Sequence, residues 1–281
     1  MRPRLFAQLQ MTLPHHALSR LVFWLTRRET RLAQPVMRWF CRTYHVALQD
    51  AANPDLSQYP SFNAFFTRAL HEHARPLEGD ACSLNCPADG RVSAVGQLDG
   101  DTVFQAKGQS YSAAALLGDA ESAARYRDSA FITVYLSPRD YHRVHMPMAG
   151  SLARMRHIPG RLFSVAPHTV DHVPGLFARN ERVVCEFDTE HGPLALVLVG
   201  AINVAAIETT WAGLVTPPAG KSITTTDYAV GAHRFERGDE MGRFNMGSTV
   251  ILLLPPGLTW RAGITSREPL RMGQWLGRFP G

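Results

Sequence analysis

The stretch that decides the fold is Phe244-Asn245-Met246-Gly247-Ser248-Thr249, which runs directly into the apolar segment Val250 to Leu254. A short apolar run bounded by turn residues predicts a buried β-strand. A glycine in front of such a strand commonly marks a bulge or a close approach of backbones. The motif is not a nucleophile elbow, because it lacks the GxSxG arrangement and a strand rather than a helix follows.

Upstream of this strand, the sequence has the same texture from about residue 85 onward. Short apolar runs are separated by Gly, Pro and Asp, as is typical of strands joined by turns. One short helix is predicted over Ser110 to Leu117. The predicted strands are 91–95, 102–106, 131–136, 183–187, 194–199, 204–207 and 250–254. We therefore expect an α+β protein whose larger part is a mainly antiparallel β domain.

The N-terminal part follows a helical pattern instead. Apolar residues recur at three- and four-residue spacing over Leu18 to Leu25 and over Leu32 to Tyr44. A third helix is predicted after Ser61 as its N-cap. The apolar face of this third helix holds Phe62, Phe65, Phe66 and Leu70. We place the division between a helical region, residues 1–72, and the catalytic domain, residues 73–281, in the polar stretch that contains Pro76.

The formal charge of +5 is unevenly distributed. Residues 1–45 hold eight arginines against one acid, Glu29, and so carry +7, which leaves −2 for the rest of the chain. A segment of one sign favours an anionic partner, either nucleic acid or a membrane leaflet. Arginines beside Trp24 and Trp39 suit helices that lie in the lipid headgroup region. Helices that pack on their own domain are the alternative reading.

Composition excludes several classes of protein. A chain of 281 residues with 45% hydrophobic and 19% charged residues is ordinary globular material rather than a disordered or fibrous protein. No stretch approaches the ~18 apolar residues of a membrane-spanning helix. An organelle transit peptide is disfavoured because the basic segment has few serines. The four cysteines lack the paired spacing of a zinc site, and we expect them to be reduced.

Three local features hold residues that can carry chemistry: Pro87 to Gly90, Tyr141 to Pro147, and the motif around Ser248. Asp89-Gly90 has the pattern of a turn in which the glycine adopts a positive φ. His142 and His145 are near enough in sequence to share a metal, but no glutamate lies between them as HExxH requires.

Together the three features supply an acid, an imidazole and a hydroxyl, which are the parts of a nucleophile, base and orienter system. A serine hydrolase that uses Asp89, His145 and Ser248 on an external substrate is therefore one reading. A non-catalytic lipid- or nucleic-acid-binding module that uses only the basic N-terminus is another.

Five blocks of the chain, in order, resemble the phosphatidylserine decarboxylases of the bacterial membrane-associated type. They are Ser61 to Arg68, Pro87 to Gly90, Lys107 to Tyr111, Tyr141 to Pro147 and Gly242 to Thr249. The resemblance runs from about residue 61 to 254 and fits the short C-terminal remainder. Gly160 to Val165 also resembles a family loop beside the active site, where Ser164 would contact the lipid headgroup.

The resemblance implies that Ser248 attacks the carbonyl of Gly247 and that the chain is cut between them, which gives chains of 247 and 34 residues. Ser248 would become a pyruvoyl group, a covalent cofactor that works without a metal. His145 would be the base for this cut and Asp89 its orienter. His142 would reprotonate the substrate α-carbon, a role that suits a histidine titrating near neutrality.

The implied reaction converts phosphatidylserine to phosphatidylethanolamine and CO2, through a Schiff base on the pyruvoyl group, in phospholipid biosynthesis. The implied partners are an anionic membrane surface and phosphatidylserine rather than nucleic acid. The two self-cleavage chains would form a heterodimer, and the resemblance suggests a homodimer of these. The implied location is peripheral, on the cytoplasmic face of the inner membrane.

Overall fold

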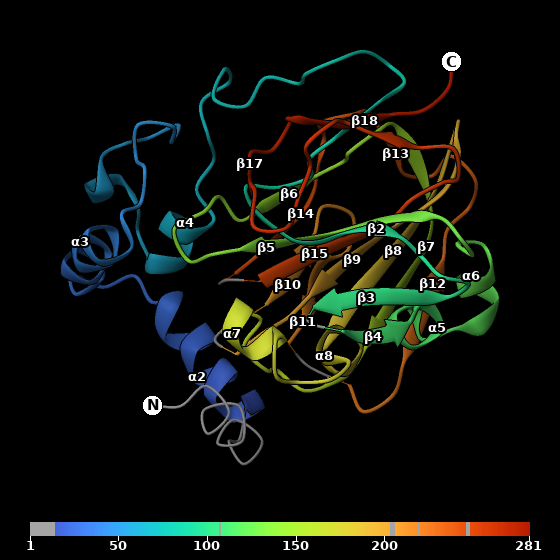
Figure 1. Cartoon of the computed structure of the whole chain (residues 1–281). Helices are drawn as coiled ribbons and strands as arrows, with labels where there is room; N and C mark the ends of the chain where they lie inside the picture. Colours follow the sequence, from blue (N-terminus) through green and yellow to red (C-terminus); the bar gives the residue numbers. More distant parts are fainter. Residues whose placement is uncertain (1–14, 107, 203–205, 218–219, 246–247) are drawn as a thin grey trace.

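The computed structural model describes residues 15–106, 108–202, 206–217, 220–245 and 248–281. In Figure 1 a large β domain lies beside a small group of N-terminal helices, on the side away from α5 and α6. The expected fold class, α+β with mainly antiparallel strands after N-terminal helices, is confirmed.

The helices are short, except for two near the N-terminus. Those two are amphipathic, in keeping with the three- and four-residue spacing of their apolar residues. The N-terminal elements are α2 (His15–Thr26), α3 (Ala33–Tyr44), the 3-10 helix η1 (Leu56–Gln58) and α4 (Phe62–Phe66). The helices within the β domain are α5 (Ala113–Leu117), α6 (Ala120–Ala124), α7 (Pro167–Val170) and α8 (Leu176–Arg179).

One large sheet forms the body of the β domain, in the order β12-β7-β8-β9-β15-β5-β2-β17, with β13 also paired to β7. All of these pairings are antiparallel. Its strands are β2 (Gly90–Gln97), β5 (Ala130–Leu136), β7 (Gly150–Ile158), β8 (Arg182–Thr189), β9 (Gly192–Val199), β12 (Thr224–Asp227), β13 (Arg234–Phe235), β15 (Ser248–Leu253) and β17 (Pro269–Leu270).

Three smaller sheets complete the domain. A four-stranded sheet has the order β11-β10-β14-β6, a three-stranded sheet the order β1-β18-β16, and β3 pairs with β4. Their strands are β1 (Ser83–Asn85), β3 (Thr102–Ala106), β4 (Gln109–Ser112), β6 (Arg143–His145), β10 (Ile207–Thr209), β11 (Gly213–Thr216), β14 (Glu240–Phe244), β16 (Thr259–Trp260) and β18 (Trp275–Arg278).

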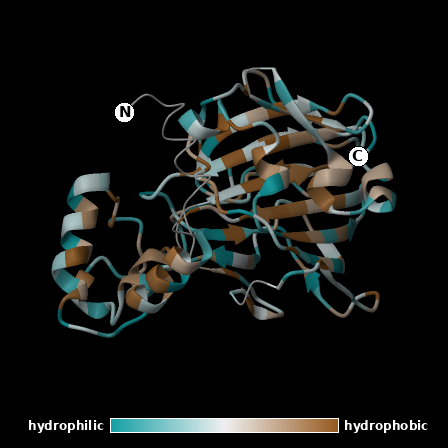
Figure 2. Ribbon diagram, turned by 90° about the horizontal axis from the view of Figure 1, so that it is seen from below, coloured by the Kyte–Doolittle hydropathy of each residue, from teal (hydrophilic) through white to brown (hydrophobic). Residues whose placement is uncertain are grey.

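Strand β15 lies at the centre of the large sheet. It is paired on one side with β5 and on the other with β9, and each of its six residues is buried. A strand with neighbours on both edges and cover on both faces reads as a continuous apolar run, which is how Val250 to Leu254 reads. In Figure 2 the strands of this domain carry much of the hydrophobic colour.

The third predicted helix is confirmed at its start and wrong at its end. The hydroxyl of Ser61 accepts a hydrogen bond from the amide of Ala64, as an N-cap does. The helix ends at Phe66, and Leu70 does not extend its face but forms a β-bridge with Ala51. A long-range backbone contact therefore overrides the local spacing.

Two other local predictions are corrected. Residues 109–112 form β4, and only Ala113–Leu117 is helical, with Ser112 as its N-cap. Gly90 is not in the positive-φ region and begins β2. The glycine is needed there because a Cβ would lie 2.4 Å from the carbonyl oxygen of Tyr135 on β5.

The two long N-terminal helices bury only part of their apolar surface. Met37 and Phe40 of α3 pack against the phenylalanines of α4 in a small core of their own. Five large apolar side chains of α2 and α3, and Leu32 just before α3, stay exposed by 46% to 73%. They are Leu21, Trp24, Leu25, Leu32, Val36 and Trp39. One face of α3 therefore packs inward on α4 while another faces outward, and the membrane reading stays a prediction.

Candidate active site

Ser248 is the first residue of β15 and is fully buried opposite Leu136 of β5. Its Oγ has no hydrogen-bond partner among the residues that the structure describes. Burying a hydroxyl without a partner costs free energy and calls for an explanation, which at an active site is reactivity. Gly247, the other half of the predicted cleavage site, lies outside the described residues.

Backbone hydrogen bonds bring the three predicted motifs together. The amide of Phe244, at the end of β14, donates to the carbonyl of His142 at 2.9 Å. The amide of His145 donates to the carbonyl of Pro87 at 2.8 Å. The segments that carry Asp89, the two histidines and Ser248 therefore meet at one end of the β domain.

His142 is fully buried, and its ring packs on Phe66 with centroids 4.1 Å apart. Its Nδ1 lies 2.8 Å from the carbonyl oxygen of Asp140, which can only accept, so Nδ1 carries the proton. Its Nε2 has no partner within the described part of the chain. Burial lowers the pKa of His142 to about 3, so the ring is neutral near pH 7. The sequence-based expectation of a histidine that titrates near neutrality is therefore wrong for His142.

His145 is held at both ring nitrogens. Nδ1 lies 2.8 Å from the carbonyl oxygen of Gly238 and Nε2 lies 3.0 Å from the hydroxyl of Tyr141. Because the carbonyl accepts from Nδ1, the tyrosine donates to Nε2. Burial lowers the pKa of His145, while the charges of Glu240 and Asp89 raise it. His145 is therefore oriented as a base whose Nε2 is the basic nitrogen.

Asp89 binds an arginine rather than a histidine. Its two carboxylate oxygens accept from Nε and Nη2 of Arg75, at 2.9 and 2.6 Å, and Oδ1 also accepts from the amide of Met272 at 2.9 Å. Among the described hydrogen bonds none joins Asp89 to His145. The orienting contact expected for Asp89 is therefore not made in this conformation, and Asp89 acts on His145 through its charge.

Sequence reasoning assigned no role to three further groups at the site. Arg75 belongs to no recognised motif, and Tyr141 lay inside the quoted histidine segment without a role. Asn245 is 1% exposed, and neither Nδ2 nor Oδ1 has a partner among the described residues. Its place in the motif before Ser248 is the one signal that singles it out.

A cavity of about 250 Å³ lies beside these groups. Its lining includes Leu136, which pairs with Ser248, and Phe66, which contacts His142. Ser164, the candidate headgroup contact, lines the same cavity. Ser248 and His142 do not themselves line the cavity, so one layer of side chains, Leu136 and Phe66, lies between it and them.

The described residues contain neither a cluster of metal ligands nor a helix that could span a membrane. Within the described ranges, no group of three or more His, Cys, Asp or Glu side chains is arranged to hold a metal ion. None of the described helices is both long enough and apolar enough to cross a membrane.

The fold and site define a class of protein: a mainly β enzyme with amphipathic N-terminal helices and a buried serine beside paired histidines. The phosphatidylserine decarboxylase family model matches residues 62–278, and a second model, described as PSD, matches residues 5–45. The chain belongs to the phosphatidylserine decarboxylase family, which confirms the resemblance seen in its motifs.

Curated relatives agree along almost the whole chain, and each is named phosphatidylserine decarboxylase proenzyme. The protein from Alkalilimnicola ehrlichii is 57% identical over 250 residues, 88% of this chain and 87% of the relative. That from Methylococcus capsulatus is 51% identical over 98% of this chain and 96% of its own. That from Pseudomonas aeruginosa strain LESB58 is 53% identical over 98% and 97%.

Proposed function

We propose that this protein converts phosphatidylserine to phosphatidylethanolamine and CO2 with a pyruvoyl group made from its own Ser248. The observation that carries the proposal is the fully buried, unpartnered Oγ of Ser248 at the start of the central strand. Family membership and the proenzyme names of the relatives support a self-processing decarboxylase.

Self-processing begins with Ser248. Its Oγ attacks the carbonyl carbon of Gly247, and the peptide nitrogen leaves, so that an ester replaces the amide bond. Elimination then breaks the Cβ–Oγ bond, releases the carboxylate of Gly247 and leaves a dehydroalanine. Water hydrolyses this dehydroalanine to the pyruvoyl group and releases ammonia. His145 is the base, because its Nδ1 is tied to Gly238 and its Nε2 is basic. The Tyr141 hydroxyl occupies Nε2 in this structure. It must therefore either relay the proton of Ser248 to His145 or rotate away from Nε2.

The surroundings of Ser248 fit a pyruvoyl group. Such a group has no charge to solvate, and residue 248 is fully buried opposite Leu136, which lines the 250 Å³ cavity. A pyruvoyl group supplies a sink for the electron pair that departing CO2 leaves behind. No free α-amine at this position has that property.

His142 moves the proton of the decarboxylation step. Its bare Nε2 takes a proton from the ammonium group of the incoming lipid and later returns it to the α-carbon. Burial keeps the ring neutral, so that Nε2 is free to accept a proton, and makes the protonated ring a strong donor to the α-carbon. The carbonyl of Asp140 and the ring of Phe66 hold the imidazole in place for both.

The two chains made by the cut stay together as a heterodimer. The smaller chain begins with β15, which is hydrogen-bonded to β5 and β9 of the larger chain along both edges. It also contributes β17, which pairs with β2, and β18, which pairs with β1. Removing it would leave the large sheet without its central strand.

The test of this proposal is a paired assay on the purified wild-type protein. Vesicles with carboxyl-labelled phosphatidylserine should release labelled CO2, and the denatured protein should give two masses, for residues 1–247 and 248–281. The smaller mass should be one ammonia below that of the same chain with an N-terminal serine. Labelled CO2 release by a single intact chain would contradict the pyruvoyl mechanism.

The N-terminal helices dock the enzyme on an anionic membrane, at the cytoplasmic face of the inner membrane in the proposed setting. The exposed apolar side chains of α2 and α3 surround a cavity of about 800 Å³ that is lined by Trp24, Phe40 and Tyr44. Arg27 and Arg28 stack over Phe23 and Trp24, which places cations beside aromatic rings. We assign docking to residues 1–72 and the chemistry mainly to residues 73–281.

Point substitutions test docking better than removal of the helices, because Phe40 of α3 is part of the packing on α4. Changing Val36 and Trp39 together to Gln should weaken binding to phosphatidylserine vesicles by at least about tenfold, from ~1.5 kcal/mol or more for each buried apolar side chain. Cosedimentation measures the effect, and high salt should weaken wild-type binding as well.

The control for docking is the pair Leu214→Gln and Val230→Gln, which removes apolar side chains that are 42% and 100% exposed on the β domain. Equal vesicle binding by both double variants would mean that α3 does not enter the membrane.

A further inference from the structure

A second cavity, of about 280 Å³, lies on the other side of the loop between β5 and β6. Five arginines line it against three aspartates. The arginines come from four separate stretches of the chain and are Arg68, Arg75, Arg91, Arg139 and Arg271. Like charges gathered around a hollow repel one another unless an anion lies among them.

The aspartates of this cationic cavity are already engaged. Arg75 alone binds both Asp50, at 2.9 Å, and Asp89, at 2.6 Å. Asp140 accepts from the amide and hydroxyl of Ser137, each at 2.7 Å, and lies 3.8 Å from Arg139. Within the described residues, Arg68, Arg91 and Arg271 have no carboxylate within 4.0 Å, and Arg139 has only the 3.8 Å contact with Asp140.

Arg68 is the clearest case. It is 4% exposed, its Nη2 makes one long contact of 3.4 Å to the carbonyl of Arg139, and its Nε has no partner among the described residues. No carboxylate lies within 4.0 Å of it in the described part of the chain. Its guanidinium lies 5.4 Å from the ring centre of Phe65. Burying a guanidinium without a counterion is expensive, so packing on Phe65 alone does not explain it.

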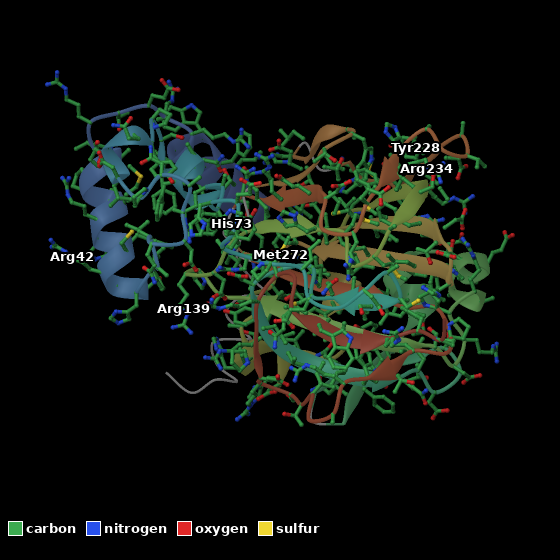
Figure 3. The ribbon with its side chains drawn as sticks, turned by 90° about the horizontal axis from the view of Figure 1, so that it is seen from above. Arg42, His73, Arg139, Tyr228, Arg234 and Met272 are labelled. Carbon is green, nitrogen blue, oxygen red and sulfur yellow. The ribbon has the colours of Figure 1, made fainter. Side chains whose placement is uncertain are left out.

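The cationic cavity adjoins the candidate active site. Arg68 follows two residues after Phe66, which contacts His142, and Arg139 follows three residues after Leu136, which pairs with Ser248. In Figure 3 Arg139 lies at the junction between the N-terminal helices and the β domain, with Arg42 farther out on the helices.

The end of α3 connects three cavities of different chemistry. Tyr44 lines both the apolar cavity of the helices and the cavity beside Ser248, and the next residue, His45, lines the cationic cavity. The chemical groups of phosphatidylserine follow one another in a similar order: apolar chains, then a phosphodiester, and then the serine group a few covalent bonds beyond it. The three cavities thus match the parts of one lipid molecule.

We propose that the cationic cavity binds a phosphate ester, and that in the working enzyme this is the phosphodiester of the lipid whose amine reacts at residue 248. Arg68 and Arg139 supply the donors. Guanidinium groups suit this role because their planar forks match the oxygens of phosphate. The assignment of the lipid rests on the proposed function, whereas the anion site itself does not.

The kinetic test uses a short-chain phosphatidylserine below its aggregation concentration, so that membrane docking plays no part. Arg68→Gln and Arg139→Gln should each be cut normally but raise KM about 10- to 100-fold, as expected for one charged hydrogen-bond partner, with kcat changed less than threefold. Inorganic phosphate should compete with the lipid in the wild type and compete less in both variants.

The matched control is Arg234→Gln, which removes one exposed arginine at the far end of the β domain, where Figure 3 labels it. KM should not change. A normal KM in cut Arg139→Gln protein would overturn the proposal. Because the Arg139 side chain is 47% exposed, this variant carries the test even where Arg68→Gln fails to fold.

Calorimetry separates this proposal from the proposed function. Inorganic phosphate titrated into the uncut Ser248→Ala protein should bind, and Arg68→Gln or Arg139→Gln in that background should weaken binding at least tenfold. This arm needs neither cleavage nor catalysis. Phosphate that binds but does not compete with the short-chain lipid would overturn the assignment to the substrate, and absence of phosphate binding would overturn the site itself.

Discussion

Ser248→Ala protein is expected to remain a single chain of 281 residues and to release no detectable CO2 from phosphatidylserine. The substitution removes one oxygen from a fully buried position where that oxygen has no partner among the described residues. Folding should therefore not suffer, since no hydrogen bond is lost. Processing and catalysis should both disappear, because the same oxygen is the nucleophile of the cut and its loss leaves no ketone.

The matched control for this experiment is the neighbouring hydroxyl. Thr249 is also fully buried, and its Oγ1 also lacks a partner in the described part of the chain. Its side chain points to the opposite face of β15, because side chains alternate along a strand. Thr249→Val should therefore be cut like the wild type. Two chains from Ser248→Ala, or an uncut Thr249→Val with Ser248 intact, would place the nucleophile elsewhere.

The central strand was predictable from sequence for a physical reason. A strand covered on both faces and paired on both edges needs consecutive apolar residues. The run Val250 to Leu254 meets this requirement and is too short for a helix of usual length. The N-terminal helices were predictable for the same kind of reason, because the apolar face of α3 requires an apolar residue every three to four positions. Periodicity did not reveal which apolar residues pack on α4 and which stay exposed.

Contacts across long stretches of chain were not predictable. The pairing of Asp89 with Arg75, and that of His145 with the carbonyl of Gly238, join segments that only the folded sheets bring together. The same holds for Gly90, whose glycine is required by the nearby backbone of Tyr135 rather than by a turn. Motif resemblance supplied the residues of the site, whereas their partners came from the fold.

His145→Ala protein is expected to stay uncut, whereas His142→Ala protein should be cut and yet release CO2 at least about 100-fold more slowly than the wild type. The two histidines differ in their contacts. His145 has its Nδ1 on Gly238 and so presents a basic Nε2, as a base for Ser248 requires. His142 has a buried Nε2 without a partner among the described residues, packs on Phe66, and is neutral near pH 7.

Denatured mass measures the cut and labelled CO2 measures turnover, so one preparation of each variant decides both questions. His73→Ala, which changes an exposed histidine at the domain junction labelled in Figure 3, is the control and should match the wild type in both assays. Because His142 is buried and His145 is half-buried, His142→Gln and His145→Gln should be compared as milder changes. If both Gln variants fold but remain uncut, the histidines do not divide the two reactions. If cut His142→Gln releases CO2 at the wild-type rate, the α-carbon takes its proton from another group.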